Sequence, residues 1–207
     1  MGRHYARDAM KWDVSLEYKY GKLIGIDEVG RGCLAGPVVS CAVVMPSNSF
    51  IQGVRDSKRL SSKKREQLSR LIRLTAIGIG YGIAEPEEID RIGIRPAVQL
   101  TMRRAVESLV ESCRMPCHIA CDYETVPLPI PQTAVIHGDD TMYPIACASI
   151  LAKVYRDRMA AAWDAQYPGY ALGQNKGYGT AQHRAGIDRL GLTPLHRRSF
   201  CKAWSFE

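Results

Sequence analysis

The stretch LIGIDEVGRG, residues 23–32, predicts the first strand of an α/β fold. Its apolar part is typical of a buried strand, which ends at two adjacent carboxylates, Asp27 and Glu28. Neighbours on a regular strand point to opposite faces. Both acids can therefore serve one site only if the strand breaks there, or if one residue also offers its backbone carbonyl. The glycines that follow permit such a break, and Arg31 between them is a candidate phosphate contact. The alternative is a surface turn with two solvated acids.

Strand and helix patterns follow one another along the rest of the chain. Apolar runs predict four more strands, at residues 37–45, 76–84, 117–122 and 133–136. Helical spacing and capping residues predict helices after Ser61, near Pro86, near Pro96, from about residue 145 to 163, and after Thr180. We expect one α/β catalytic domain over residues 1–168, whose first 20 or so residues are a peripheral extension. A loop and a small C-terminal helical element that contacts the substrate are expected over residues 169–207.

Composition and charge favour a soluble protein with a polyanionic partner. Hydrophobic residues make up 46% of the chain and charged residues 24%. No apolar run approaches the ~20 residues of a membrane span, and the N-terminus lacks a secretory signal, so we expect a cytoplasmic protein without membrane contact. The net charge is +7, and residues 55–73 alone hold eight basic and two acidic residues. Residues 174–207 hold six basic and two acidic residues, and two such zones favour nucleic acid as the partner. The alternative is a pair of solvated helix faces.

The seven cysteines predict reduced thiols rather than disulfides. Cys113, Cys117, His118 and Cys121 lie close together in the sequence. Their spacing lacks the C-x2-C pairs of structural zinc sites. We therefore expect buried thiols on and before a core strand instead of a zinc ion.

Two further acids stand where they could meet the first pair. Asp122 ends the predicted strand 117–122, and ligand sites in open α/β sheets favour that edge. The alternative for Asp122 is a turn residue that begins the Pro-rich connector. Asp157 shares a helix face with Ser149 and Lys153 through i, i+4, i+8 spacing. The alternative for Asp157 is an ordinary surface salt bridge with Lys153.

The four acids Asp27, Glu28, Asp122 and Asp157 would form an oxygen-only set of metal ligands. Such a set suits hard divalent ions, Mg²⁺ or Mn²⁺. Two ions about 4 Å apart can hold the attacking water and the leaving oxygen of a phosphodiester in line. The chain has no Walker A sequence and no Ser/His/Asp context that suggests a triad. Acids beside a basic surface therefore favour a nucleic-acid phosphodiesterase over a kinase.

Several separated motifs resemble those of the ribonuclease HII family, the type 2 ribonucleases H, in the family's order from about Tyr20 to Phe200. They are GIDEVGRG at 25–32, LAGPVV at 34–39, DSKRLS at 56–61, MRRAV at 102–106, GD at 138–139, ASILAKV at 148–154 with RD at 156–157, KGYGT at 176–180, His183, HR at 196–197 and SF at 199–200. Any one of them could arise by chance, whereas all of them in order are specific.

The resemblance implies an α/β, ribonuclease H-like fold: a mixed five-stranded sheet flanked by helices, with a small C-terminal helical element. It implies that the four acids named above are catalytic and bind metal. The implied substrate contacts are Gly30, Arg31, Gly32, Lys58, Ser149, Lys153, Tyr178 and Arg198. Of these, Tyr178 is expected to pack against the sugar on the DNA side of an RNA–DNA junction.

The implied activity is endonucleolytic hydrolysis of the RNA strand of RNA–DNA hybrids, and cleavage 5′ of ribonucleotides embedded in duplex DNA. The products would be 3′-hydroxyl and 5′-phosphate ends, as ribonucleotide excision repair requires. We expect a monomer without an appended sliding-clamp peptide. One rival is a hybrid-binding module with a decayed site, which would have lost an acid. Another is a carboxylate nuclease of the integrase or junction-resolvase kind, against which the GRG and KGYGT segments argue.

Three positions depart from the family pattern. Tyr123 follows Asp122 where the family usually has glycine, Cys33 stands where proline is common, and His137 stands where a lysine often precedes Gly-Asp. All four predicted metal-binding acids are present, so these departures indicate tuning rather than loss of activity.

Overall fold

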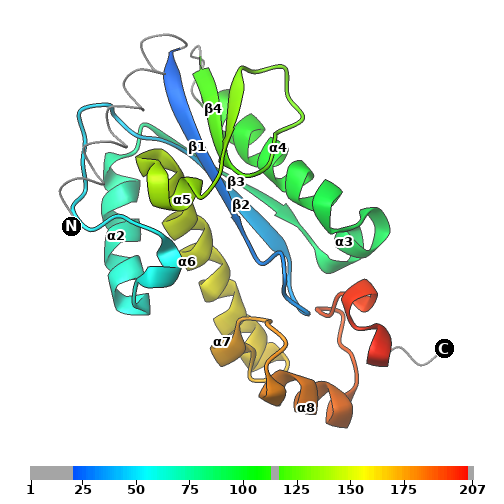
Figure 1. The fold of residues 1–207 in the computed structure, drawn as a ribbon. Coiled ribbons are helices and arrows are strands. Elements are labelled where there is room, and N and C mark those ends of the chain that lie inside the picture. The colour runs from blue at the N-terminus through cyan, green and yellow to red at the C-terminus, as the bar shows by residue number, and fades with distance from the viewer. Residues whose placement is uncertain (1–20, 113–116, 205–207) are drawn as a thin grey trace.

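A mixed five-stranded sheet lies at the centre of the computed structural model, which describes residues 21–112 and 117–204 (Figure 1). The order across the sheet is β3-β2-β1-β4-β5. β1 pairs antiparallel with β2, and β2 with β3, whereas β1, β4 and β5 run parallel. The strands are β1 Lys22–Val29, β2 Val38–Val44, β3 Gly78–Ala84, β4 Cys117–Asp122 and β5 Gln132–Val135. This sheet confirms the predicted fold class.

The pairing of β1 with β4 brings two acids to one edge of the sheet. Ile26 pairs with Cys121 in the parallel register, so Asp27 and Asp122 follow at the next position of each strand. β1 does not break after Asp27, because it stays paired with β2 as far as Val29. Asp27 and Glu28 therefore leave a regular strand on opposite faces.

Helices cover both faces of the sheet (Figure 1). Alternate residues of β2 belong to different cores, since Val38 and Ala42 pack with α4 while Cys41 and Val43 pack with α2 and α6. The helices are α2 Ser62–Thr75, α3 Pro86–Ile92, α4 Ile94–Ser112, α5 Gly138–Thr141, α6 Tyr143–Gln166, α7 Leu172–Asn175 and α8 Ala181–Leu190, with 3-10 turns η1 Ser57–Arg59, η2 Arg198–Phe200 and η3 Lys202–Trp204.

Helix α6 touches the strand that carries Asp27. A Cβ at position 25 of β1 would lie 2.2 Å from the carbonyl carbon of Pro144, so only glycine allows this approach. Further along α6, Ser149 forms a hydrogen bond to the carboxylate of Asp27. The packing of α6 on β1 thus supports the acid at the strand end.

The predicted helix starts at Ser61 and Thr180 are confirmed. Ser61 accepts a hydrogen bond from the backbone N–H of Lys64, and Thr180 accepts one from that of His183, both at 3.3 Å. The sequence analysis did not predict α5 or α7, because a single helical turn shows no periodicity.

The C-terminal segment packs on the end of α6 and on the loop between β1 and β2 (Figure 1). Trp163 of α6, Leu172 of α7 and Ile187 of α8 meet Ala35 in a separate apolar cluster. Ala35 also forms an isolated β-bridge with His196. In the described part of the chain, no helix is both long and apolar enough to cross a membrane.

The predicted N-terminal extension and Cys113 lie outside the described residues. The six cysteines that the structure describes are free thiols. Cys117 and Cys121 lie on β4, where Cys121 is buried in the core and its thiol donates to the carbonyl of Glu124 at 2.9 Å. They match the expectation of thiols on a core strand.

Candidate active site

Asp27 is a buried carboxylate at the end of β1. Its Oδ1 accepts a hydrogen bond from the backbone N–H of Glu28 at 2.8 Å. Burial raises the pKa of Asp27 well above the usual range, and the charges of Glu28, Asp122 and Asp139 raise it further, while the hydrogen bond from Ser149 lowers it. A buried carboxylate crowded by other carboxylates is a position that a cation would stabilise.

Asp122 is the common neighbour of the other acids. Its charge raises the pKa of Asp27, of Glu28 and of Asp139. Its Oδ1 accepts a hydrogen bond from the backbone N–H of Gly138 at 2.7 Å, which ties the end of β4 to α5. The interpretation of Asp122 as a mere turn residue gives no reason for this convergence of charges.

Glu28 lies on the opposite face of β1 from Asp27 but remains electrostatically connected to the cluster. Burial raises the pKa of Glu28 to about 7. The charge of Arg31 lowers this pKa, and the charge of Asp122 raises it. Nη1 of Arg31 lies 3.7 Å from Oε1 of Glu28. Arg31 also lies 3.2 Å from Glu124. The predicted phosphate contact Arg31 therefore already bridges two acids at the edge of the site.

Asp139 belongs to this cluster, and the sequence analysis assigned it no role. It is buried at the start of α5, and Lys58 Nζ lies 3.5 Å from its Oδ2. Burial raises its pKa, the charge of Lys58 lowers it, and the charge of Asp122 raises it. The signal that could have found it was the Gly138-Asp139 motif.

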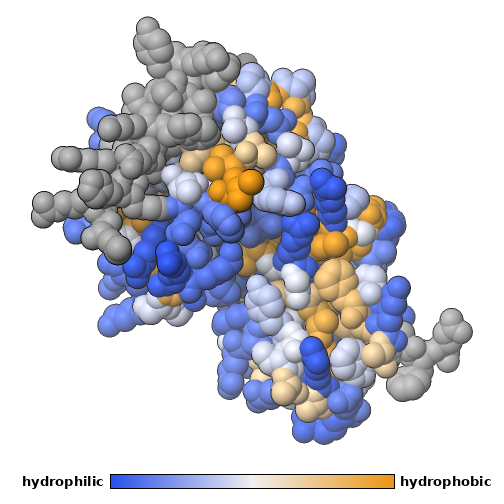
Figure 2. Space-filling model, viewed as in Figure 1, coloured by the Kyte–Doolittle hydropathy of each residue, from blue (hydrophilic) through white to orange (hydrophobic). Residues whose placement is uncertain are grey.

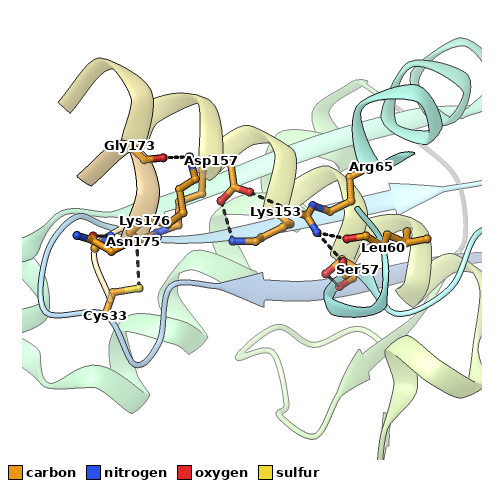
Figure 3. Close-up of polar contacts among 12 residues, drawn as sticks. Cys33, Ser57, Leu60, Arg65, Lys153, Asp157, Gly173, Asn175 and Lys176 are labelled. Carbon is orange, nitrogen blue, oxygen red and sulfur yellow. Dashed lines mark hydrogen bonds and ion pairs between the residues drawn. The ribbon is translucent and has the colours of Figure 1, made fainter. Parts of the chain in front are cut away.

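Asp157, predicted to bind metal, is paired with two cations in this structure. Its Oδ1 accepts from Lys153 Nζ at 2.7 Å and its Oδ2 lies 3.6 Å from Arg65, as Figure 3 shows. Arg65 in turn donates to the carbonyls of Ser57 and Leu60. Asp157 does not contribute to the raised pKa of Asp27, Glu28 or Asp139. It instead supports, through Arg65, the turn that carries Lys58.

The predicted substrate contacts around Gly30–Gly32 and Tyr178 come together. The backbone N–H of Leu34 donates to the carbonyl of Gly177 at 2.8 Å, which joins the loop after β1 to the turn that precedes Tyr178. Gly177 has φ +85°, and a Cβ there would lie 2.2 Å from the carbonyl oxygen of Ala35, so glycine is required. The side chain of Tyr178 is 42% exposed beside this junction.

Two fully buried arginines hold this junction together. Arg156 donates to the carbonyls of Ala35, Pro37 and Lys176 at 2.6–2.9 Å. Arg197 donates to the carbonyls of Gly30, Arg31 and Gly36 at 2.7–2.9 Å. Each guanidinium thus fixes three backbone groups, so the loop is held in shape before any ligand binds. The sequence analysis assigned neither arginine this role.

The remaining predicted substrate contacts have different surroundings. Lys58 lies against Asp139, whereas Lys153 is paired with Asp157. Ser149 is buried and shares a hydrogen bond of 2.9 Å with Ser57. Arg198 is exposed, and its backbone N–H donates to the carboxylate of Asp90 on α3.

The donor set of the cluster fits a hard divalent ion. Asp27, Glu28, Asp122 and Asp139 offer only carboxylate oxygens, which Mg²⁺ and Mn²⁺ prefer. Within the described residues, no three such side chains already converge on one point as metal ligands. Burial, and then the charges of neighbouring acids, raise the pKa values of three of the four, and a bound cation would favour their ionised forms.

Comparison with known proteins agrees with this geometry. The family model described as ribonuclease HII matches residues 24–203. The chain belongs to the ribonuclease HII family. The ribonuclease HII of Alkaliphilus metalliredigens is 47% identical over 189 residues, which cover 90% of this chain and 93% of that relative. That of Synechococcus elongatus is 49% identical over 189 residues, with 89% and 87% coverage.

The fold also matches that of a solved ribonuclease H. The crystal structure of ribonuclease H2 from Pyrococcus horikoshii OT3 superimposes with a TM-score of 0.67 at 23% identity, covering 86% of this chain and 93% of that one. As a member of the ribonuclease HII family, the chain is an endonuclease of the ribonuclease H type. Its activity is therefore directed at the RNA of RNA–DNA hybrids.

Proposed function

We propose that this ribonuclease HII cuts 5′ of ribonucleotides embedded in duplex DNA as well as within RNA–DNA hybrids, by metal-assisted hydrolysis that leaves 3′-hydroxyl and 5′-phosphate ends. The observation that carries the proposal is that the charge of Asp122, at the carboxyl end of β4, raises the pKa values of Asp27, Glu28 and Asp139. Ligand sites in open α/β sheets favour this edge.

The metal site we propose consists of Asp27, Glu28, Asp122 and Asp139. One or two divalent ions bound there would activate water and stabilise the leaving oxygen. Ser149 keeps the carboxylate of Asp27 in place through its hydrogen bond. Asp139 replaces Asp157 in this set, because Asp157 is occupied by Lys153 and Arg65.

Recognition of the ribonucleotide falls to the loop after β1. The 2′-hydroxyl is the group that distinguishes RNA from DNA at a given site. The glycines at 30 and 32 allow backbone groups to approach that hydroxyl closely. Arg197 fixes the loop by donating to the carbonyls of Gly30 and Arg31. Tyr178, beside the loop, would pack on the next sugar, where a deoxyribose fits and a second 2′-hydroxyl would crowd the ring.

The same proposal includes a monomeric enzyme in the cytoplasm that acts in ribonucleotide excision repair. Lys58 and Arg198 would contact phosphates of the substrate. Residues 169–207 would act as the substrate-contacting element, since they supply Tyr178 and, through Arg197, the support of the loop.

A cleavage assay on matched substrates tests this function. An RNA–DNA hybrid, a DNA duplex and the same duplex with one ribonucleotide are incubated with Mg²⁺ or Mn²⁺, and the ends of the products are mapped. We expect cleavage of the hybrid and a single cut 5′ of the embedded ribonucleotide, with a 3′-hydroxyl and a 5′-phosphate. Cleavage of the all-DNA duplex would favour another carboxylate nuclease, and binding without cleavage would favour a hybrid-binding module.

A further inference from the structure

Tyr123 has a backbone conformation that a tyrosine adopts rarely. Its φ is +60°, in the left-handed region that favours glycine. The backbone holds it there, because the N–H of Tyr123 donates to the carbonyl of Val135 at 3.0 Å and that of Glu124 donates to the carbonyl of Asp122 at 2.7 Å. Strain of this kind persists where the surroundings over-determine it, and it concentrates at functional sites.

Burial does not compensate this strain. The side chain of Tyr123 is 70% exposed, and that of Ile136 is 71% exposed. Asp122 pairs with Val135 in the register of β4 and β5, so Tyr123 and Ile136 are the next residues of two neighbouring strands. Figure 2 shows a small hydrophobic spot among hydrophilic residues near the place where Figure 1 draws α5. Tyr123 and Ile136 are thus two exposed residues that follow directly after neighbouring strand ends.

The pair flanks the acids on the side opposite to Tyr178. The loop after β1 leads to β2 and is joined to the turn before Tyr178. β4 and β5 lie on the other side of β1 in the sheet. A nucleic-acid strand whose phosphate lies over Asp27 and Asp122 would therefore meet Tyr178 on one side and Tyr123 on the other.

The surrounding charges favour nucleic acid as the occupant. Lys58 and Arg59 have side chains that are 78% and 64% exposed, and they lie against Asp139 and Asp140 of α5, which begins two residues after Ile136. Cations beside an exposed aromatic ring combine phosphate contacts with a stacking platform. Two apolar residues alone are too few for a stable protein–protein interface.

We propose that Tyr123, with Ile136 beside it, contacts the cut strand on the 5′ side of the scissile phosphate, where the tyrosine ring stacks on a base. The inference rests on the proposed function, because the 5′ side is defined by the assignment of Tyr178 to the deoxyribonucleotide on the 3′ side. It makes Tyr123 a substrate-binding residue of this chain in addition to the loop after β1.

Binding measured without divalent ions tests the contact, because no cleavage then occurs. Wild type, Tyr123→Gly and Tyr123→Phe are titrated into a labelled duplex with one embedded ribonucleotide, and affinity is read by fluorescence anisotropy. We expect the glycine variant to bind about five-fold or more weakly, the low end of what stacking on one base contributes. The phenylalanine variant keeps the ring and can still stack on a base, so its affinity should stay within about two-fold of wild type. The dependence of affinity on salt should not change, since no charge is removed.

Abasic sites introduced singly into the cut strand locate the stacked base. An abasic site at the contacted position on the 5′ side should weaken wild type but not Tyr123→Gly, so that the two proteins bind that duplex alike. The proposal is overturned if an abasic site weakens wild type more than Tyr123→Gly only at positions 3′ of the cut, or at no position. A cleavage assay on wild type separates this failure from failure of the proposed function, because an enzyme that cuts as proposed yet shows no coupling refutes Tyr123 alone.

A control variant separates stacking from other effects. Leu74→Ala removes another exposed apolar side chain, on α2, and should bind the duplex as wild type does. The melting temperature of Tyr123→Gly should not fall, because glycine adopts this φ readily. Equal losses of affinity and of melting temperature in the glycine and phenylalanine variants would make Tyr123 a structural residue and overturn the inference.

Discussion

The carboxylate of Asp122 accepts a hydrogen bond from the backbone N–H of Gly138, at 2.7 Å. This contact joins the end of β4 to α5 and holds Asp139 where the charge of Asp122 acts on it. The pairing of Asp122 with Val135 on β5 brings the two segments together. Asp139 therefore joins the cluster because the ends of β4 and β5 meet, and not because of its position relative to a face of α6.

Asp139→Asn should abolish most Mg²⁺-dependent cleavage, as should Asp27→Asn, because a neutral amide supports a hard cation poorly. We expect less than about a tenth of wild-type turnover in saturating Mg²⁺, a loss of more than about 1.4 kcal/mol of transition-state stabilisation. Turnover and melting temperature are measured together, so that loss of folding is seen separately.

Asp157→Asn is the matched control for that experiment. It breaks the ion pairs with Lys153 and Arg65, so we expect a loss of stability of about 1–3 kcal/mol with more than about a tenth of turnover retained. An inactive Asp157→Asn with an unchanged melting temperature, beside an active Asp139→Asn, would return Asp157 to the metal site.

Glu28 should make stability and activity depend on pH in opposite directions. Burial raises its pKa to about 7, from 4.5. The stability that comes from its protonated form is complete below pH 4.5 and is lost as the pH rises through about 7. Without divalent ions, Glu28→Gln should therefore melt at a higher temperature than wild type at pH 8, and the difference should vanish near pH 4. Cleavage by wild type should rise with pH through the same range, because a divalent ion binds the ionised carboxylate.

More Mg²⁺ should move the cleavage profile to lower pH, since metal and proton compete for Glu28. A pH profile of cleavage that does not change with Mg²⁺ concentration would argue against Glu28 as a metal ligand. Melting curves in a chelator and initial rates at several Mg²⁺ concentrations provide both readouts.

Lys58→Ala and Arg198→Ala should each weaken hybrid binding equally at all sequences. If each side chain contacts one phosphate, the slope of log affinity against log salt should become shallower by roughly one unit per variant. Arg91→Ala removes an exposed arginine on α3 and serves as the control with an unchanged slope. A slope equal to wild type in either test variant would assign that residue to an ordinary solvated face.

Tyr178→Ala should reduce cleavage at a single embedded ribonucleotide far more than it reduces binding to plain DNA duplex, because it removes the surface that packs on the neighbouring deoxyribose. Rates on the hybrid and on the embedded ribonucleotide are compared with affinity for the plain duplex. Equal slowing on all substrates together with a melting temperature several degrees lower would instead make Tyr178 a packing residue of the C-terminal element.

His183 and His196 should make the protein sensitive to acid. They are buried with their Nε2 atoms 3.1 Å apart. The backbone N–H of Thr193 donates to Nδ1 of His196, so the proton between the rings comes from His196, and His183 Nδ1–H can donate to the carbonyl of Tyr178 at 2.9 Å. The three hydrogen bonds that link Thr193, His196, His183 and Tyr178 therefore form together only while both rings are neutral.

Burial lowers the pKa of His196 to about 4, and the charge of His183 lowers it further, while burial also lowers that of His183. The stability of the neutral pair is complete above pH 6.5 and is lost as the pH falls through the lowered pKa values. For His196 the loss is about 1.4 kcal/mol per pH unit down to about pH 4. Melting temperatures across this range should fall in wild type and fall less in a His183→Gln, His196→Gln double variant. Parallel curves for the two proteins would contradict the assignment.

The strands, the longer helices and three of the four acids in the proposed site could be predicted from the amino-acid sequence. Apolar runs that end in Asp27 and Asp122 are local signals, and the position of a strand end needs no knowledge of distant residues. The helix starts at Ser61 and Thr180 are local for the same reason, since the capping bond spans three residues.

The acid that completes the cluster and the groups that fix the loop after β1 could be found only from the packing of distant segments. Asp139 lies on α5 and Asp157 on α6. The bond from Gly138 to Asp122 places Asp139 beside the other acids, whereas Arg65 pairs with Asp157. Arg197 reaches the carbonyls of Gly30 and Arg31 across more than 160 residues. Such contacts depend on how the strands and helices pack, and packing between distant segments leaves no periodic trace in the sequence.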